Sequence, residues 1–79
     1  MNVQVSYFAA FREAAGVASE RVDTGSATAA ALFDECAARH PALQRYTASL
    51  VAINDEMSPW DAALAEGDEV LFFPPVAGG

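Results

Sequence analysis

The residues with the clearest capacity for chemistry are the last two, Gly78 and Gly79. Neither glycine carries a Cβ atom, so the pair can enter a channel that is too narrow for any other dipeptide. The reactive group would then be the terminal carboxylate of Gly79, and the rest of the chain would hold it out. Small residues also collect at frayed termini without any function, so the pair gains meaning only from the residues before it.

The segment before the glycines predicts a strand that stops abruptly. Glu69–Phe73 is rich in β-branched and aromatic residues, which favour strands. Pro74 and Pro75 end this strand because proline has no N–H for a ladder, and they hold the base of the tail extended. We therefore expect a folded domain over residues 1–75 and an extended tail over residues 76–79.

No side-chain constellation for catalysis is visible elsewhere in the sequence. Cys36, the single cysteine, falls on the apolar side of a predicted helix, which favours a core residue over a reactive thiol. His40, the single histidine, has no second metal ligand in view. The carboxylates of Asp55–Glu56 and Asp68–Glu69 lie in predicted turns, where we expect them to be solvated. One cysteine also excludes an internal disulfide and a four-cysteine iron–sulfur cluster, so we expect no bound cofactor and no metal site.

Composition indicates one small acidic domain. Of the 79 residues 53% are hydrophobic, and eleven acidic residues against four arginines give a net charge of −7. This charge argues against nucleic acid and anionic membranes as partners. It favours a protein partner with a basic surface, unless it serves solubility alone. No stretch approaches the ~20 apolar residues of a membrane span, and the N-terminus does not resemble a signal peptide, so we expect a cytoplasmic protein.

The opening segment predicts two strands around a short helix. Residues 1–8 alternate between apolar and polar positions, which is typical of a half-buried strand, although Phe8 lies on the polar side. Residues 9–15 are prone to form a helix, and Gly16 ends that helix. Residues 17–24 contain a second, weaker strand. Because so few residues join the two strands, we expect them to pair antiparallel.

A longer helix is predicted after Thr28. We prefer Thr28 to Ser26 as the N-cap because an apolar stripe at helical spacing starts directly after it. The stripe consists of Ala29, Leu32, Phe33, Cys36 and Ala37. Pro41 stops the helix, and residues 41–47 are expected to form an irregular connection.

The remaining elements complete a mixed sheet. Residues 49–54 predict a mostly buried strand, residues 57–58 a brief strand, and residues 60–64 a turn of helix that Leu64 anchors. The last strand is apolar on both sides, which suits a central position beside the first strand. This order of elements indicates an α+β fold, a β-grasp whose mixed sheet packs on one main helix.

Four apolar residues are predicted to share the outward side of that sheet. If alternate residues of the last strand face the helix, Leu71 and Phe73 face outward. Phe8 lies on the outward side of the first strand, and Met57 can reach the same side. Clustered aromatic and methionine side chains usually mark a protein interface when they are exposed. The alternative is that Phe73 packs beneath a loop.

Motifs spread over nearly the whole chain form a recognisable set. They are Phe11-Arg12-Glu13 with Gly16, Thr28 with Leu32, Asn54, Leu64, Gly67-Asp68-Glu69-Val70, Phe73-Pro74-Pro75-Val76 and Gly78-Gly79. Together they resemble the small subunits of molybdopterin synthase, which are ubiquitin-like sulfur carriers. The thiamine sulfur carrier also ends in Gly-Gly, but the diproline and the Phe-Arg-Glu segment are more similar to the molybdopterin protein. Ala77 falls at a position that varies within the family.

The resemblance implies how the tail is used. An ATP-dependent activating enzyme would adenylate the Gly79 carboxylate, and sulfur would then replace one oxygen to give a thiocarboxylate. The tail would insert into the active site of a molybdopterin synthase large subunit, and the sulfur would pass to a cyclic pyranopterin monophosphate precursor to form the molybdopterin dithiolene. We therefore expect a hetero-oligomer in which this chain has no catalytic side chain of its own. The residues expected to contact the partner are Phe8, Met57, Leu71, Phe73, Pro74, Pro75, Val76 and Ala77.

Three other functions stay open at this point. The chain is alternatively a sulfur carrier for thiamine synthesis or another pathway, a ubiquitin-like modifier, or a binding module with an inert tail. A co-purifying large subunit would identify the pathway of a sulfur carrier. A ladder of conjugates would indicate a modifier, and partner affinity that survives deletion of the tail would indicate a binding module.

Overall fold

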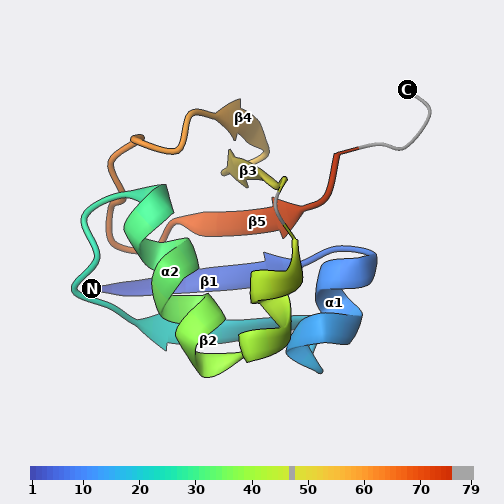
Figure 1. Ribbon diagram of the computed structural model, residues 1–79. Coiled ribbons are helices and arrows are strands. Elements are labelled where there is room, and N and C mark those ends of the chain that lie inside the picture. Colours follow the sequence, from blue (N-terminus) through green and yellow to red (C-terminus); the bar gives the residue numbers. More distant parts are fainter. Residues whose placement is uncertain (47, 76–79) are drawn as a thin grey trace.

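The computed structural model describes residues 1–46 and 48–75. They form a five-stranded sheet with a long helix across one face (Figure 1). In chain order the elements are β1 Asn2–Tyr7, α1 Ala10–Ala15, β2 Ser19–Asp23, α2 Ala29–Arg39, the 3-10 helix η1 Pro41–Arg45, β3 Leu50–Ile53, β4 Glu56–Ser58 and β5 Glu69–Phe73. Within these ranges, no helix has the length and apolar character needed to cross a membrane.

The sheet is mixed because its first and last strands lie side by side and run in the same direction. The strand order is β2-β1-β5-β3-β4. β1 pairs with β5 in parallel and with β2 antiparallel, while β3 pairs antiparallel with both β5 and β4. The central position of β5 confirms the prediction from its two apolar sides. The predicted α+β arrangement, a mixed sheet on one main helix, is also confirmed.

The core lies between the sheet and α2. Tyr7 pairs with Phe72 across the parallel ladder, and both side chains are buried, as is Leu32 of α2. Phe72 lies at the centre of an aromatic cluster. The Trp60 ring stacks on it with centroids 5.9 Å apart, and the Phe33 ring meets it edge-on at 5.0 Å. Because such ring pairs stabilise beyond their buried area by about 0.5–1.5 kcal/mol, this cluster fixes which side of β5 faces inward.

Local signals end the helices where the sequence indicates. The Thr28 hydroxyl accepts a hydrogen bond from the Ala31 N–H at 3.2 Å, which confirms Thr28 as the N-cap of α2. Gly16 closes α1 in the left-handed region with φ 79°. α2 ends at Arg39, two residues before Pro41. These helix ends follow from short-range backbone chemistry, which explains why the sequence predicts them well.

The turn of helix predicted over residues 60–64 is wrong. The backbone of this segment bonds to the start of α2 instead, since the Ala30 N–H donates to the Trp60 carbonyl at 2.9 Å. Thr28 forms an isolated antiparallel bridge with Ala63. The first N–H groups of a helix have no partner within that helix. The carbonyl groups of residues 60–64 accept hydrogen bonds from these N–H groups of α2. These long-range hydrogen bonds outweigh the local preference of the segment for a helix.

The connection after α2 is also more ordered than predicted. Residues 41–47 were expected to be irregular, but Pro41–Arg45 form the 3-10 helix η1. Leu43 of this helix is fully buried, so its packing against the core explains the order. Thr47 lies outside the described residues. Leu64 packs against the core, as the sequence predicted.

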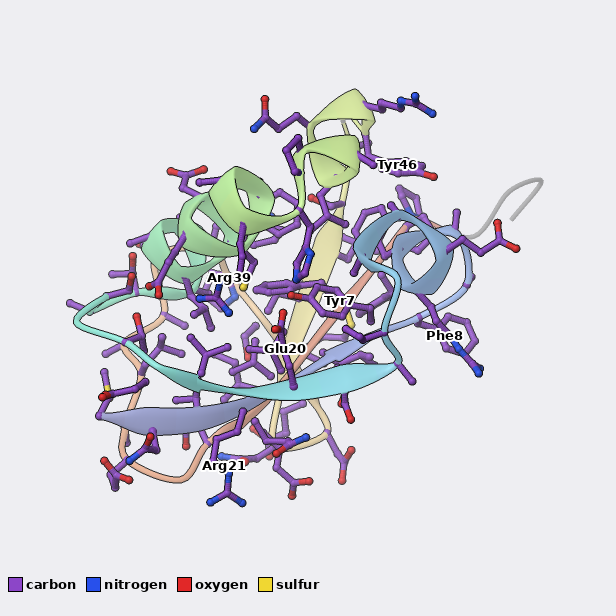
Figure 2. All side chains as sticks on the ribbon, turned by 90° about the horizontal axis from the view of Figure 1, so that it is seen from below. Tyr7, Phe8, Glu20, Arg21, Arg39 and Tyr46 are labelled. Carbon is purple, nitrogen blue, oxygen red and sulfur yellow. The ribbon has the colours of Figure 1, made fainter. Side chains whose placement is uncertain are left out.

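Polar side chains close the edge of the core between β2 and α2 (Figure 2). The Tyr7 O–H donates to Glu20 Oε2 at 2.6 Å, and His40 Nε2 lies 2.9 Å from the same oxygen. Arg39 lies 3.3 Å from the other carboxylate oxygen of Glu20. Partial burial by itself raises the pKa of Glu20. The hydrogen bonds from Tyr7 and His40 and the charges of His40 and Arg39 outweigh it, so the pKa lies below its ordinary value.

Acid should destabilise the protein partly through Glu20. Because folding lowers the pKa of Glu20, its ionised carboxylate stabilises the fold fully above the unfolded pKa of about 4.5, and this contribution is lost as the pH falls through the folded pKa. Glu20→Gln should therefore lower the free energy of unfolding at neutral pH and flatten its decrease in acid. Urea unfolding at a series of pH values measures both effects.

Glu13→Gln is the matched control, because Glu13 is an exposed carboxylate on α1. This variant should keep the pH profile of the parent protein. If Glu20→Gln also kept that profile, the carboxylate of Glu20 would have no part in acid destabilisation.

Candidate functional site

The outer face of the sheet, opposite α2, carries a group of apolar side chains. Strand register places Leu71 of β5 beside Ala52 of β3, and Ala52 beside Met57 of β4. In the next row, Phe73 pairs with Leu50. On β3 and β5 these positions alternate with the buried Val51, Val70 and Phe72, so their side chains point away from α2. Met57 shares the face of its cross-strand neighbour Ala52.

Phe8 extends this surface beyond the end of β1. Its N–H donates to the Phe72 carbonyl at 3.1 Å, which continues the parallel ladder by one residue. The side chain is 61% exposed, and Figure 2 shows it pointing away from the core. Phe8 therefore lies on the outer face beside Phe73. We call the resulting surface the outer-face patch; it consists of Phe8, Leu50, Ala52, Met57, Leu71 and Phe73.

The structure brings together four of the predicted contact residues on the outer face of the sheet, Phe8, Met57, Leu71 and Phe73. Their contact with a partner remains a prediction. Two further members of the patch, Leu50 and Ala52, were missed because their strand was predicted to be mostly buried. Residues 50–53 are all apolar, so the sequence does not show which alternate positions face inward, and the burial of Val51 in the structure is what places these two residues on the outer face. Ala52 is only 8% exposed yet does not belong to the core cluster, so its outer-face neighbours cover it.

β5 carries the chain to the edge of the outer-face patch. Pro74 is half-buried and Pro75 is exposed, and both follow Phe73 directly. The predicted tail, its partner contacts and its reactive carboxylate all fall within residues 76–79, which lie outside the described residues. The part of the predicted site that the structure describes is therefore the outer-face patch and the strand that leads to the tail.

Acidic side chains border the outer-face patch. Asp55 and Glu69 line a hollow together with Ala52 and Leu71. Asp55 and Glu69 are both exposed. The patch thus has an apolar centre with two carboxylates beside it, which suits a partner surface that is apolar with basic groups at the matching positions.

Asp68 has a structural role, contrary to the expectation that it is solvated. Its carboxylate accepts hydrogen bonds from Asn54 Nδ2 at 3.0 Å and from the Ala65 N–H at 2.8 Å. Asn54 also accepts from the Glu69 N–H at 3.0 Å. These bonds hold the β3–β4 turn against the start of β5. The border of the outer-face patch is therefore fixed relative to its centre.

The side chains with intrinsic catalytic chemistry serve the fold. Cys36 is fully buried, which confirms it as a core residue, and burial raises the pKa of its thiol. Burial also raises the pKa of the Tyr7 hydroxyl, which stays protonated and donates to Glu20. His40 contacts the same carboxylate. Among the described residues, no group of three or more His, Cys, Asp or Glu side chains is arranged to hold a metal ion.

The turn into α1 holds Phe8 on the outer face. The Phe11 N–H donates to the Phe8 carbonyl at 3.1 Å. Ala9, between them, adopts φ 55° and ψ −126°, as at the first central position of a type II′ turn, where glycine is usual. A residue with a side chain costs of order 1–3 kcal/mol in such a conformation. Backbone strain is therefore stored directly beside the outer-face patch.

Known proteins resemble this chain over nearly its whole length. A model of the ThiS family matches residues 5–79. The chain is 41% identical to the molybdopterin synthase sulfur carrier subunit of Chlamydomonas reinhardtii, with 100% of both chains covered. It is 38% identical to the protein of the same name from Haemophilus influenzae, over 98% of this chain and 99% of that one. The crystal structure of small archaeal modifier protein 1 from Haloferax volcanii superposes with a TM-score of 0.84 at 34% identity, covering 95% and 98% of the two chains.

Replacing Ala9 by glycine should stabilise the protein. Glycine adopts a φ of 55° without steric cost. The relief of strain should outweigh the extra flexibility of the unfolded chain, so we expect the free energy of unfolding to rise by about 1 kcal/mol. Chemical denaturation measures the change.

Ala31→Gly is the matched control for this substitution. Ala31 is exposed in α2, where glycine should destabilise by about 1 kcal/mol. If Ala9→Gly and Ala31→Gly lowered the free energy of unfolding equally, the turn at Ala9 would hold no strain.

Proposed function

This chain belongs to the ThiS family, and from that premise we propose that it is a sulfur carrier whose C-terminal glycine becomes a thiocarboxylate. In this proposal it is the small, sulfur-donating subunit of a molybdopterin synthase. The relatives from Chlamydomonas reinhardtii and Haemophilus influenzae, which match almost end to end, are named molybdopterin synthase sulfur carrier subunits.

The observation that carries the proposal is the way β5 connects the core, the outer-face patch and the tail. Phe72 anchors the strand in the core, while Leu71 and Phe73 lie on the outer face. Pro74 and Pro75 follow at once. A partner that covers the patch would therefore also meet the start of residues 76–79. The folded body can bind the partner while the last residues enter its active site.

The proposed chemistry takes place at the Gly79 carboxylate. A carboxylate is a poor electrophile, so an ATP-dependent activating enzyme joins one of its oxygens to the α-phosphate of ATP and releases pyrophosphate. A sulfur nucleophile then adds to the carbonyl carbon, and AMP leaves with that oxygen. The resulting thiocarboxylate is anionic near neutral pH, and its softer sulfur is a better nucleophile than oxygen.

The sulfur then passes to an acceptor in the active site of the large subunit. The resemblance implies that the acceptor is a cyclic pyranopterin monophosphate precursor and that two transfers build the dithiolene. Gly78 and Gly79 provide a tail thin enough for a narrow channel, and the preceding prolines reduce the entropy lost on insertion. Acid–base groups come from the large subunit, because Cys36 and His40 serve the fold of this chain.

The large subunit should present a surface that is apolar at its centre and basic at its border. The outer-face patch supplies the apolar half of such an interface, and Asp55 and Glu69 supply acidic groups beside it. The net charge of −7 adds a long-range attraction toward a basic partner. Charge complementarity of this kind mainly raises the association rate and orients the partners.

A ubiquitin-like modifier is the second candidate, because the chain is 34% identical to small archaeal modifier protein 1. In that function the activated Gly79 carbonyl would be joined to a lysine of another protein. This sequence contains no lysine, so conjugates would not extend through its own lysine side chains. Blots of a tagged chain separate the two functions: a ladder of conjugates supports the modifier, and a thiocarboxylate without conjugates supports the carrier.

Deletion of Gly79 should abolish sulfur transfer while the domain stays folded. The parent protein, incubated with the activating enzyme, ATP and a sulfur source, should exchange one carboxylate oxygen for sulfur, and intact-mass spectrometry detects this exchange. The deletion variant, which ends at Gly78, should show no exchange of oxygen for sulfur. Its melting temperature should equal that of the parent, since the reactive end is proposed to lie outside the core.

Two results would contradict this picture. A parent protein that remains unmodified with several competent activating enzymes would argue against a sulfur carrier. A large loss of melting temperature on deletion of Gly79 would assign the tail to the fold rather than to the chemistry.

Truncation of Phe8 should weaken binding of the large subunit without unfolding the chain. Phe8 is 61% exposed, so Phe8→Ala removes little packed surface. Aromatic anchors at an interface often contribute more than 1 kcal/mol, so we expect Kd to rise about tenfold or more. Titration calorimetry measures the affinity, and Gln4→Ala, on the polar part of the same face, is the control that should bind normally. Equal affinities of the two variants would remove Phe8 from the interface.

A further inference from the structure

Met57 is the member of the outer-face patch whose chemical character can change. It lies on β4, an edge strand of the sheet, and its side chain is 62% exposed. Register with Ala52, and through Ala52 with Leu71, places it in the row that crosses the outer face. Met57 therefore forms the outer end of the apolar row on the surface assigned to the large subunit.

We propose that the Met57 thioether is an oxidation site whose sulfoxide closes the outer-face patch to the partner. The inference rests on the proposed function, because it takes the large subunit as the occupant of the patch. Hydrogen peroxide is the oxidant in the simplest case. The sulfur attacks one peroxide oxygen, an S–O bond forms and the O–O bond breaks. The other oxygen leaves as hydroxide and takes the proton from the oxygen now on sulfur, which gives the sulfoxide and water. The sulfur gives up two electrons and the peroxide accepts them.

The oxidised side chain opposes docking because it is polar. A thioether is soft and apolar, so it packs well against an apolar surface. A sulfoxide carries a strong acceptor oxygen, which would lose its water on burial. Ala52 and Leu71, its neighbours in the row, have no side-chain donor, and the Asp55 carboxylate beside them is an acceptor when ionised and cannot donate to it. Burial of an unpartnered polar group corresponds to roughly a 5- to 100-fold loss of affinity.

The fold should tolerate this oxidation. Met57 is exposed on an edge strand and is not part of the core cluster, so the added oxygen displaces no core atom. Met1 is the second methionine of the chain and is 36% exposed, but it precedes β1 and is not a member of the outer-face patch. A variant that lacks only the Met57 thioether therefore isolates the effect.

The test is binding of the large subunit before and after treatment of the full chain with hydrogen peroxide. Peptide mapping should find one added oxygen at Met57, and Kd should rise about tenfold. The melting temperature should stay near that of the untreated protein, and methionine sulfoxide reductase should restore binding. Met57→Leu keeps an apolar side chain of similar size and cannot be oxidised. It should bind equally well before and after peroxide.

The outcomes separate this inference from the proposed function. Unchanged affinity with Met57 fully oxidised would overturn the inference, and so would an equal loss of affinity in Met57→Leu. A fall in melting temperature that accounts for the lost binding would overturn it as well, since oxidation would then act on the fold. If the untreated chain did not bind the large subunit at all, the assigned partner and the proposed function would fail first, and the inference with them.

Discussion

The parallel pairing of β1 with β5 is the constraint on which the rest of the structure depends. It joins the first strand to the last at the centre of the sheet, and the other strands extend the sheet outward from this pair. Parallel neighbours need a long crossover connection, and the connection here includes α2, which covers one face (Figure 1). The sheet therefore has one face committed to the core and one that is free to meet a partner.

The alternation of side chains along β5 couples those two faces. Phe72 packs with Phe33 and Trp60 in the core, while Leu71 and Phe73 point outward. A slip of one residue in register would exchange these sets. The aromatic cluster that stabilises the interior therefore also decides which side chains a partner meets. The stability of the domain and the composition of the outer-face patch depend on the same register.

Adjacent residues at the end of β1 show the same division of roles. The Tyr7 hydroxyl is tied to Glu20 at the edge of the core, whereas Phe8 points outward and is followed by the strained turn at Ala9. Cys36 and His40 also serve the interior and its edge. The groups with familiar catalytic chemistry thus hold the domain together, which accords with a proposed reaction at the end of the chain.

The amino-acid sequence by itself determined the features that depend on neighbouring residues. Thr28, Gly16 and Pro41 predict their helix ends because capping and proline sterics act over a few residues. Alternation predicts β1, and β-branched and aromatic residues predict β5, because both signals are local. Only the tertiary structure decided the conformation of residues 60–64, the structural role of Asp68 and the outward direction of Leu50 and Ala52. Each of these depends on contacts between segments far apart in the chain, such as the bond from Ala30 to Trp60 and the one from Asn54 to Asp68. Local propensity carries no information about such partners, because they become neighbours only when the chain folds.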